Sequence, residues 1–166
     1  MPARPVDLPD AVRTKARAQG AEGARWLRDL DALVDDVSAE WGVRIGEVLT
    51  GGSGGLVAAA WTAAGAPVVL KLAIPDGLDG HGPFEDEVAT LLLGAGGGYV
   101  QVLRHDVDRR AILLERLGRS LATLGLPVPS QLEVIARTLA LGWRPVGEAP
   151  LPSGADKARW LAQFID

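Results

Sequence analysis

The stretch TGGSGGLVAAAWTAAGAPVVLK, residues 50–71, contains a glycine-rich turn, two apolar runs and a lysine inside the second run. The turn consists of five consecutive small residues, Gly51, Gly52, Ser53, Gly54 and Gly55. Because glycine has no side chain, the backbone N–H groups of such a turn are uncovered and can bind phosphate. Lys71 lies in an apolar, β-rich segment, where a lone ammonium group is costly to desolvate and usually has an anionic partner. The turn and the lysine together predict a nucleoside triphosphate site.

Two other interpretations of this stretch are open. In the first, the glycines form only a flexible hairpin entry, and Lys71 lies on the solvent face of an edge strand. In the second, the stretch belongs to a dinucleotide-binding βαβ unit with strands 43–49 and 68–74, a helix 56–64 and Asp76 as the ribose ligand. That unit would place Lys71 in a sheet buried on both faces, and its helix would contain residues that suit a strand better. No Gly-Lys-Ser/Thr follows the glycines, so the turn is not a Walker A loop.

The composition is ordinary for a globular protein and argues against several classes of function. The chain has 166 residues, of which 48% are apolar and 23% charged, enough for one domain or for one lobe of a larger protein. A net charge of -4 gives no reason to expect nucleic acid or a membrane surface as partner. With no cysteine, and His81 and His105 as the two histidines, we expect no disulfide and no metal site. The sequence has neither a signal peptide nor an apolar segment long enough to span a bilayer, so we expect a cytoplasmic protein.

Hydrophobic periodicity divides the chain into helices, strands and loops. Helices are predicted over 11–18, 22–41, 84–93, 131–141 and 156–165. Strands are predicted over 43–49, 56–61, 68–74, 99–103 and 111–115, with a charged turn over 105–110. Loops are predicted over 76–83, 94–98, 118–129 and 144–155. Because hairpins join neighbouring strands, we predict an α+β fold with a five-stranded antiparallel sheet and one packed helix. We divide the chain into an N-terminal helical segment 1–42, the sheet region 43–117, and a region 118–166 that begins a helical lobe.

Two further segments complete a candidate nucleotide site. Glu87, on the predicted helix 84–93, could hold Lys71 in place as an ion pair. Glu85 and Asp86 share that helix, so Glu87 could instead belong to a solvated acidic face. The run ILLERL, residues 112–117, ends a strand and enters a connector, where backbone groups could meet the edge of an adenine ring.

In this order, the segments EGARWLRDL, AEWGV, LTGGSGGLV, VVLKLAIP, EDEVATLLLGAGGG and AILLERLGRSL resemble the streptomycin-type aminoglycoside phosphotransferases. This group is also called the aminoglycoside/hydroxyurea antibiotic resistance kinases. The resemblance runs from about Leu8 to Leu121, and the combination of GGSGG, VLK and ILLERL is more specific than any one of them. It implies the small, ATP-binding lobe of a protein-kinase-like fold.

By this resemblance, the complete enzyme transfers the γ-phosphoryl group of ATP to a hydroxyl of an aminoglycoside and so confers antibiotic resistance. Lys71 would bind the α- and β-phosphates, Glu87 would pair with it, and Glu115 to Leu117 would form the hinge. The turn departs from the protein-kinase pattern G-x-G-x-x-G-x-V, because Val57 stands where the third glycine would be.

The family's catalytic loop has no counterpart in this chain. Kinases of this kind use an Asp base and a metal-binding Asn, followed by a second Asp for Mg²⁺. The sequence contains no asparagine, and its one His-Asp pair, His105-Asp106, precedes the hinge in chain order. We therefore expect no catalytic residue here, Mg²⁺ ligands beyond Asp166, and no phosphotransferase activity from this chain alone.

An incomplete lobe would expose apolar surface, so self-association is expected. A function of another class, a non-catalytic nucleotide-binding or interaction module, also fits these residues.

Overall fold

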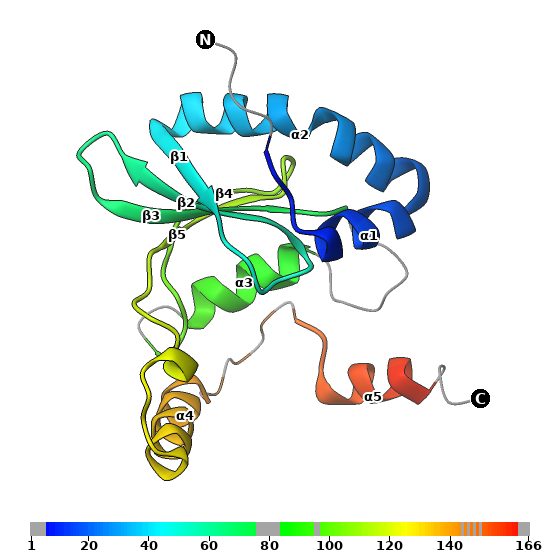
Figure 1. The fold of residues 1–166 in the computed structure, drawn as a ribbon. Helices are drawn as coiled ribbons and strands as arrows, with labels where there is room; N and C mark the ends of the chain where they lie inside the picture. Colours follow the sequence, from blue (N-terminus) through cyan, green and yellow to red (C-terminus); the bar gives the residue numbers. More distant parts are fainter. Residues whose placement is uncertain are drawn as a thin grey trace.

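The computed structural model describes residues 6–75, 84–94, 97–143, 145, 147, 149 and 151–162. Its centre is one antiparallel sheet of five strands, in the spatial order β1-β2-β3-β5-β4 (Figure 1). The strands are β1 (Val43–Val48), β2 (Gly55–Thr62), β3 (Pro67–Ala73), β4 (Val102–Asp106) and β5 (Ala111–Glu115). The predicted α+β class and the five-stranded antiparallel sheet are confirmed.

The position of β3 excludes the edge-strand placement of Lys71 and the dinucleotide-binding unit, whereas the alternative that the glycines form only a hairpin entry stays open. Lys71 pairs with Val57 of β2 and with Ile112 of β5, so it lies in the central strand and not at an edge. Residues 55–62 form an antiparallel strand rather than the helix that a dinucleotide-binding unit requires. The β-branched and aromatic residues of that segment fit a pleated surface better than a helix, which explains the outcome.

Two N-terminal helices cover one face of the sheet, α1 (Asp10–Ala18) and α2 (Gly20–Trp41). The apolar residues of α2 recur at helical spacing and are buried, among them Trp26 and Trp41, which confirms their predicted place in the core. The helix ends at Gly42, whose φ of 63° is left-handed and suits glycine. Leu56, Leu70 and the buried side of α2 belong to a single hydrophobic cluster, so the helices and the sheet share one core.

The opposite face of the sheet carries α3 (Phe84–Gly94). Phe84 and Val88 of this helix are buried against Ala73 of β3 and Ile112 of β5. This helix corresponds closely to the predicted helix 84–93. The predicted loop 76–83 lies outside the described residues, as does part of the predicted loop 94–98.

The prediction for the fourth strand was wrong, because the observed strand begins and ends three residues later in the chain. The sequence predicted a strand over 99–103 and a turn over 105–110, whereas β4 runs from Val102 to Asp106 and the turn covers 107–110. The carboxylate of Asp106 accepts hydrogen bonds from the Arg109 backbone N–H at 2.8 Å and from its Nε at 2.7 Å, which closes a shorter turn. Arg110 then adopts a left-handed φ of 51° before β5 begins.

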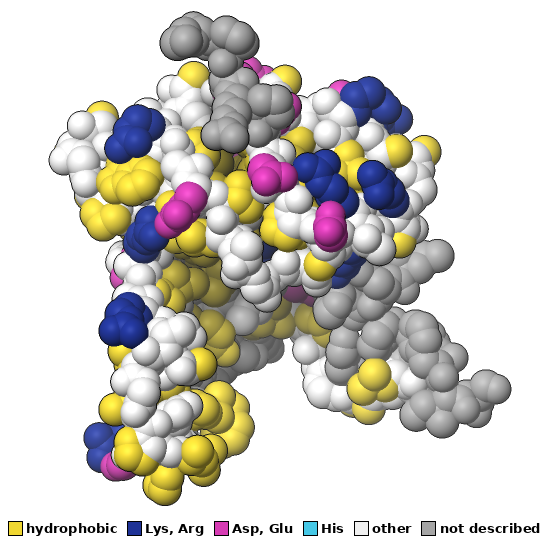
Figure 2. Space-filling model, viewed as in Figure 1, with side chains coloured by type: hydrophobic (Ala, Val, Ile, Leu, Met, Phe, Trp, Pro, Cys, Tyr) yellow, Lys and Arg dark blue, Asp and Glu magenta, His cyan; other side chains and the backbone are white. Residues whose placement is uncertain are grey.

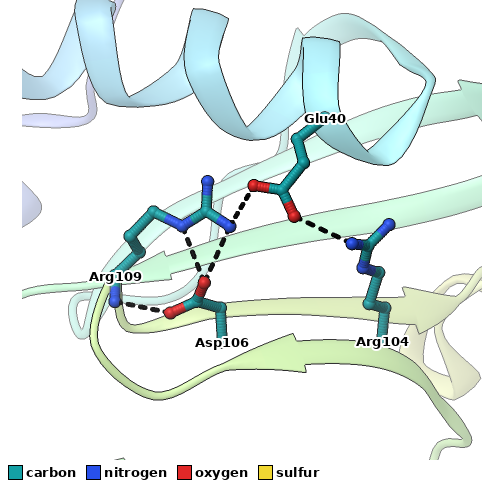
Figure 3. A network of polar contacts seen from close by, with 4 residues as sticks. All are labelled: Glu40, Arg104, Asp106 and Arg109. Carbon is teal, nitrogen blue, oxygen red and sulfur yellow. Dashed lines mark hydrogen bonds and ion pairs between the residues drawn. The ribbon is translucent and has the colours of Figure 1, made fainter.

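A polar network joins this hairpin to the last turn of α2 (Figure 3). Glu40 accepts from Arg104 at 2.8 Å and pairs with Arg109 at 2.6 Å, through its two different carboxylate oxygens. The guanidinium group of Arg104 also lies 5.3 Å from the centre of the Trp41 ring. Because Gly42 leads directly into β1 at one edge of the sheet, α2 is attached to both edge strands.

The described residues after β5 include three helical segments, η1 (Leu121–Thr123), α4 (Val128–Gly142) and α5 (Gly154–Ala162). The fourth helix begins three residues before its predicted start at residue 131, because Pro129 lies in its first turn, where proline is well tolerated. Residues 163–165, the end of the last predicted helix, lie outside the described part. Among the described helices, none is both long and apolar enough to cross a lipid bilayer.

Candidate functional site

Lys71 and Glu87 are in direct contact, and this pair is the centre of the candidate site. The Lys71 Nζ donates to Glu87 Oε1, forming a hydrogen bond within an ion pair. The Lys71 side chain is 21% exposed and that of Glu87 is 38% exposed, so the pair is partly shielded while part of each side chain stays accessible. The structure therefore brings together the two residues that the sequence suggested as partners. Glu85, on the same helix, is exposed, and among the described residues it forms no ion pair with Lys71.

The local packing explains why these two side chains meet. Residues paired across antiparallel strands share a face of the sheet, so Lys71 lies on the same face as Ile112. Ile112 is buried beneath Phe84 and Val88, which fixes α3 on that face. Glu87 directly precedes Val88 on the helix, so the packing that buries Val88 also holds the carboxylate near the lysine.

The glycine turn lies between β1 and β2, at the end of β2 that pairs with the end of β3. Gly55 pairs with Ala73 and Val57 with Lys71, so the turn ends two residue pairs from the lysine, about 7 Å along the strand. A Cβ added at Gly52 or Gly54 would meet no atom within 4 Å, whereas one at Gly55 would overlap the carbonyl oxygen of Leu72.

The open part of the turn is therefore residues 51–54, which are all exposed, including Ser53. Gly51 has a left-handed φ of 113°, a conformation that a residue with a side chain rarely adopts. Gly54 accepts a hydrogen bond from the Ile74 N–H at 3.0 Å, which ties the turn to the end of β3. Four residues of the turn are thus accessible, whereas Gly55 is buried where β2 pairs with β3.

Of the predicted hinge residues, Glu115 is held by hydrogen bonds to Gln101, whereas Leu117 is exposed to solvent. Glu115 ends β5, and its side chain accepts a hydrogen bond from the Gln101 N–H at 2.8 Å. The Glu115 N–H also donates to the Gln101 carbonyl at 3.0 Å. Leu117 is 64% exposed at the beginning of the connector.

The residues that suggested a catalytic pair or a ribose ligand either form contacts of their own or lie away from the Lys71–Glu87 pair. Asp106 pairs with Arg109, and the backbone N–H of Arg109, followed by the Arg109 side chain, lowers the pKa of this carboxyl group. His105, its neighbour, is exposed on the edge strand β4. Asp76, the ribose ligand of the dinucleotide hypothesis, falls outside the described residues. Within the described ranges, no three His, Cys, Asp or Glu side chains are grouped so that they could hold a metal ion.

The structure also contains a cavity that the sequence did not indicate. It has a volume of about 350 Å³ and lies between α2 and β1, on the face of the sheet opposite Lys71. Leu56 and Ala58 contribute to its lining, and Asp31 and Asp35 of α2 line it as well. Asp31 accepts a hydrogen bond from the Val6 N–H at 3.0 Å, so this carboxylate holds the start of the described chain. No sequence pattern distinguishes these positions from an ordinary amphipathic helix.

The chain is similar to two curated proteins named streptomycin 6-kinase. It is 31% identical over 120 residues to the protein from Streptomyces glaucescens, an overlap of 69% of this chain and 36% of that relative. It is 30% identical over 126 residues to the protein from Streptomyces griseus, an overlap of 72% of this chain and 38% of that relative. No family model matches the chain. The match spans little more than a third of the length of these relatives, and it confirms the predicted resemblance to streptomycin-type phosphotransferases.

Proposed function

We propose that this chain forms the nucleotide-binding part of a streptomycin-type aminoglycoside phosphotransferase, with ATP as phosphoryl donor. The observation that carries the proposal is the ion pair between Lys71 and Glu87, held on the central strand two residue pairs from an open glycine turn. The similarity to two streptomycin 6-kinases supports the reaction class. In this proposal the sheet and α3 correspond to the small lobe of a protein-kinase-like fold.

Each part of the site has a defined task in binding ATP. The ammonium group of Lys71 neutralises charge on the α- and β-phosphates, and Glu87 fixes its position so that little reorganisation is needed on binding. The backbone N–H groups of Gly51, Gly52 and Gly54 face the phosphates, and these three residues have no side chain that would cover them. Backbone groups between Glu115 and Leu117 meet the edge of the adenine ring. In this proposal the Mg²⁺ that accompanies ATP is not held by the described residues, because no three of their His, Cys, Asp or Glu side chains are grouped to bind a metal ion.

Calorimetric titration with ATP tests the assignment of Lys71. We expect Lys71→Met, which keeps the aliphatic bulk and removes the charge, to abolish measurable ATP binding. Circular dichroism should show an unchanged fold, because the side chain is partly exposed and methionine keeps its aliphatic bulk. Unchanged affinity for ATP would remove Lys71 from the site.

The neighbouring glutamates of α3 provide a matched pair of variants for the role of Glu87. We expect Glu87→Gln to weaken ATP binding by about tenfold or more, since it removes a charge-assisted contact that positions the lysine. Glu85→Gln removes the same charge from an exposed position of the same helix, so it should leave the affinity nearly unchanged. Equal effects of the two variants would show that only the net charge of the helix matters.

A further inference from the structure

An ion pair joins the start of the connector to the edge strand β1. The Nη2 atom of Arg116 lies 3.8 Å from Oε1 of Glu47. Arg116 directly follows β5, whereas Glu47 belongs to β1, and the strands β2 and β3 lie between β1 and β5 in the sheet. The side chain of Arg116 therefore reaches across neighbouring strands to make this contact.

The strand register shows on which face of the sheet the Arg116 side chain lies. The β-bulge between Ile45 and Val48 places Glu47 beside the middle of β2, so the ion pair does not pass around the ends of the strands. The α2 side of β2, β3 and β5 is filled by the hydrophobic cluster that these strands share with α2, which leaves no room for an arginine. Arg116 therefore crosses on the face that carries Lys71.

The surface that Arg116 crosses is apolar and lies next to the Lys71–Glu87 pair. Val69 of β3 pairs with Leu114 of β5, and both side chains are half-buried on this face. Val69 precedes Lys71 by two residues, about 7 Å along the strand. In Figure 2 hydrophobic side chains gather below the sheet, left of centre, where the connector begins. A flat ring bound here would contact apolar side chains, and phosphates attached to it could reach the ammonium group.

The ion pair is poorly placed to stabilise the fold. Its two atoms are 3.8 Å apart, and the Glu47 side chain is 74% exposed. Ion pairs that are this long and this exposed contribute little to stability, because water and salt screen them. The Arg116 side chain is only 29% exposed, so most of it rests against the protein. The contact with Glu47 is therefore better explained as one that fixes where the guanidinium group lies.

A guanidinium group held in this way suits the ring of a nucleobase. The group is planar and more weakly hydrated than an ammonium group, so it stacks well on aromatic rings, and nucleobases are bound by such stacking in many proteins. The carboxylate of Glu47 limits the rotation of the Arg116 side chain before the ligand arrives. Less conformational entropy is then lost when the ring binds.

We propose that Arg116 is a nucleobase-binding residue, whose guanidinium plane stacks on the ring while Val69 and Leu114 contact the ring from the sheet. Glu47 is a positioning residue, because it acts on the ring only through Arg116. This inference rests on the proposed function and deepens it, since it assigns side chains to the base of the nucleotide, whereas Lys71 and the glycine turn are assigned to the phosphates.

Calorimetric titration with ATP and with inorganic tripolyphosphate separates binding of the base from binding of the phosphates. We expect Arg116→Ala to raise the dissociation constant for ATP by about tenfold, through the loss of stacking, and to leave that for tripolyphosphate nearly unchanged. Arg119→Ala removes the same charge from the connector, where Arg119 donates to the Thr123 carbonyl at 2.6 Å, and is the matched control. It should bind both ligands like the unmodified chain. Urea denaturation should show that Arg116→Ala is as stable as the unmodified chain, because the ion pair is exposed.

A double-mutant cycle with Glu47→Gln tests the positioning role. We expect Glu47→Gln alone to weaken ATP binding by about threefold, and to add no further loss in the Arg116→Ala background, because Glu47 acts through the arginine. Independent effects of the two substitutions would contradict the positioning role of Glu47. If Arg116→Ala binds ATP like the unmodified chain, or loses tripolyphosphate binding as strongly as ATP binding, Arg116 does not bind the base. If the unmodified chain binds neither ligand, the proposed function is wrong and this inference is wrong with it.

Discussion

A methyl group added at Gly55 would overlap the carbonyl oxygen of Leu72 and lie 2.8 Å from the Cα of Ala73. Gly55 is therefore required where β2 approaches β3 closely, whereas Gly52 has open space around it. We expect Gly55→Ala to lower the free energy of unfolding by about 1–3 kcal/mol, since the strands must separate to admit the methyl group. Gly52→Ala should change it by less than about 0.5 kcal/mol. Urea denaturation of both variants measures the difference, and equal effects would contradict the distinction.

At the level of single residues, the sequence suggested the right partners for Lys71 but not the different roles of the glycines. An ammonium group in an apolar strand requires an anion nearby, but the choice of Glu87 over Glu85 of the same helix came from the resemblance to the phosphotransferase family. The five small residues of the turn looked equivalent, because the close approach of Leu72 to Gly55 arises only when the strands pair. The role of the turn in nucleotide binding stays a prediction.

At the level of elements, the boundaries that the sequence predicted well are those set by apolar patterns. The strand Ala111–Glu115 was predicted with its observed ends, because apolar residues fill it and charged residues flank it. The preceding strand was misplaced because its second half, Arg104 to Asp106, is charged or polar and looked like a turn. Those side chains are accommodated because β4 is an edge strand and because Arg104 and Asp106 join the network with Glu40. Contacts between distant segments, which no local pattern encodes, decided this boundary.

The β4–β5 hairpin should make the stability of the fold depend on acid pH. The hydrogen bond from the Arg109 N–H and the Arg109 side chain lower the pKa of Asp106 in the folded state. Its charged form therefore stabilises the fold above about pH 4, and this stabilisation is lost as the pH falls through the lowered pKa. We expect Asp106→Asn to reduce the free energy of unfolding by about 1 kcal/mol at pH 7, because an amide keeps the acceptor but loses the charge.

Urea denaturation at pH 7, pH 5 and pH 3 would measure this effect. The difference in free energy of unfolding between the unmodified chain and Asp106→Asn should persist at pH 5 and become smaller below pH 4. Asp108→Asn changes an exposed carboxylate of the same turn and is the control, with an expected effect below about 0.5 kcal/mol at every pH. A gap that stays constant down to pH 3 would mean that the charge of Asp106 does not stabilise the hairpin.

At the level of the whole molecule, the N-terminal helices and the sheet act as one structural unit. Leu30 of α2 is 3% exposed and belongs to the same hydrophobic cluster as Leu70 of β3. The sequence predicted an amphipathic helix in this region, but its periodicity could not say which surface the apolar side covers. The structure shows that this surface is the face of the sheet opposite Lys71, so α2 supports the strand that carries the lysine.

Because α2 and β3 share one core, a substitution that destabilises α2 should also destabilise β3. We expect Leu30→Ala to lower the free energy of unfolding by about 2–5 kcal/mol, through lost burial and the cavity it leaves. Because the cluster spans both elements, hydrogen exchange of the protected amides in α2 and β3 should accelerate by a similar factor, as in one cooperative unit. Leu132→Ala removes the same atoms from exposed α4 and should leave both sets of amides unchanged. If exchange accelerates in α2 alone, the helix unfolds independently of the sheet. In that case α2 does not stabilise the strand that contains Lys71.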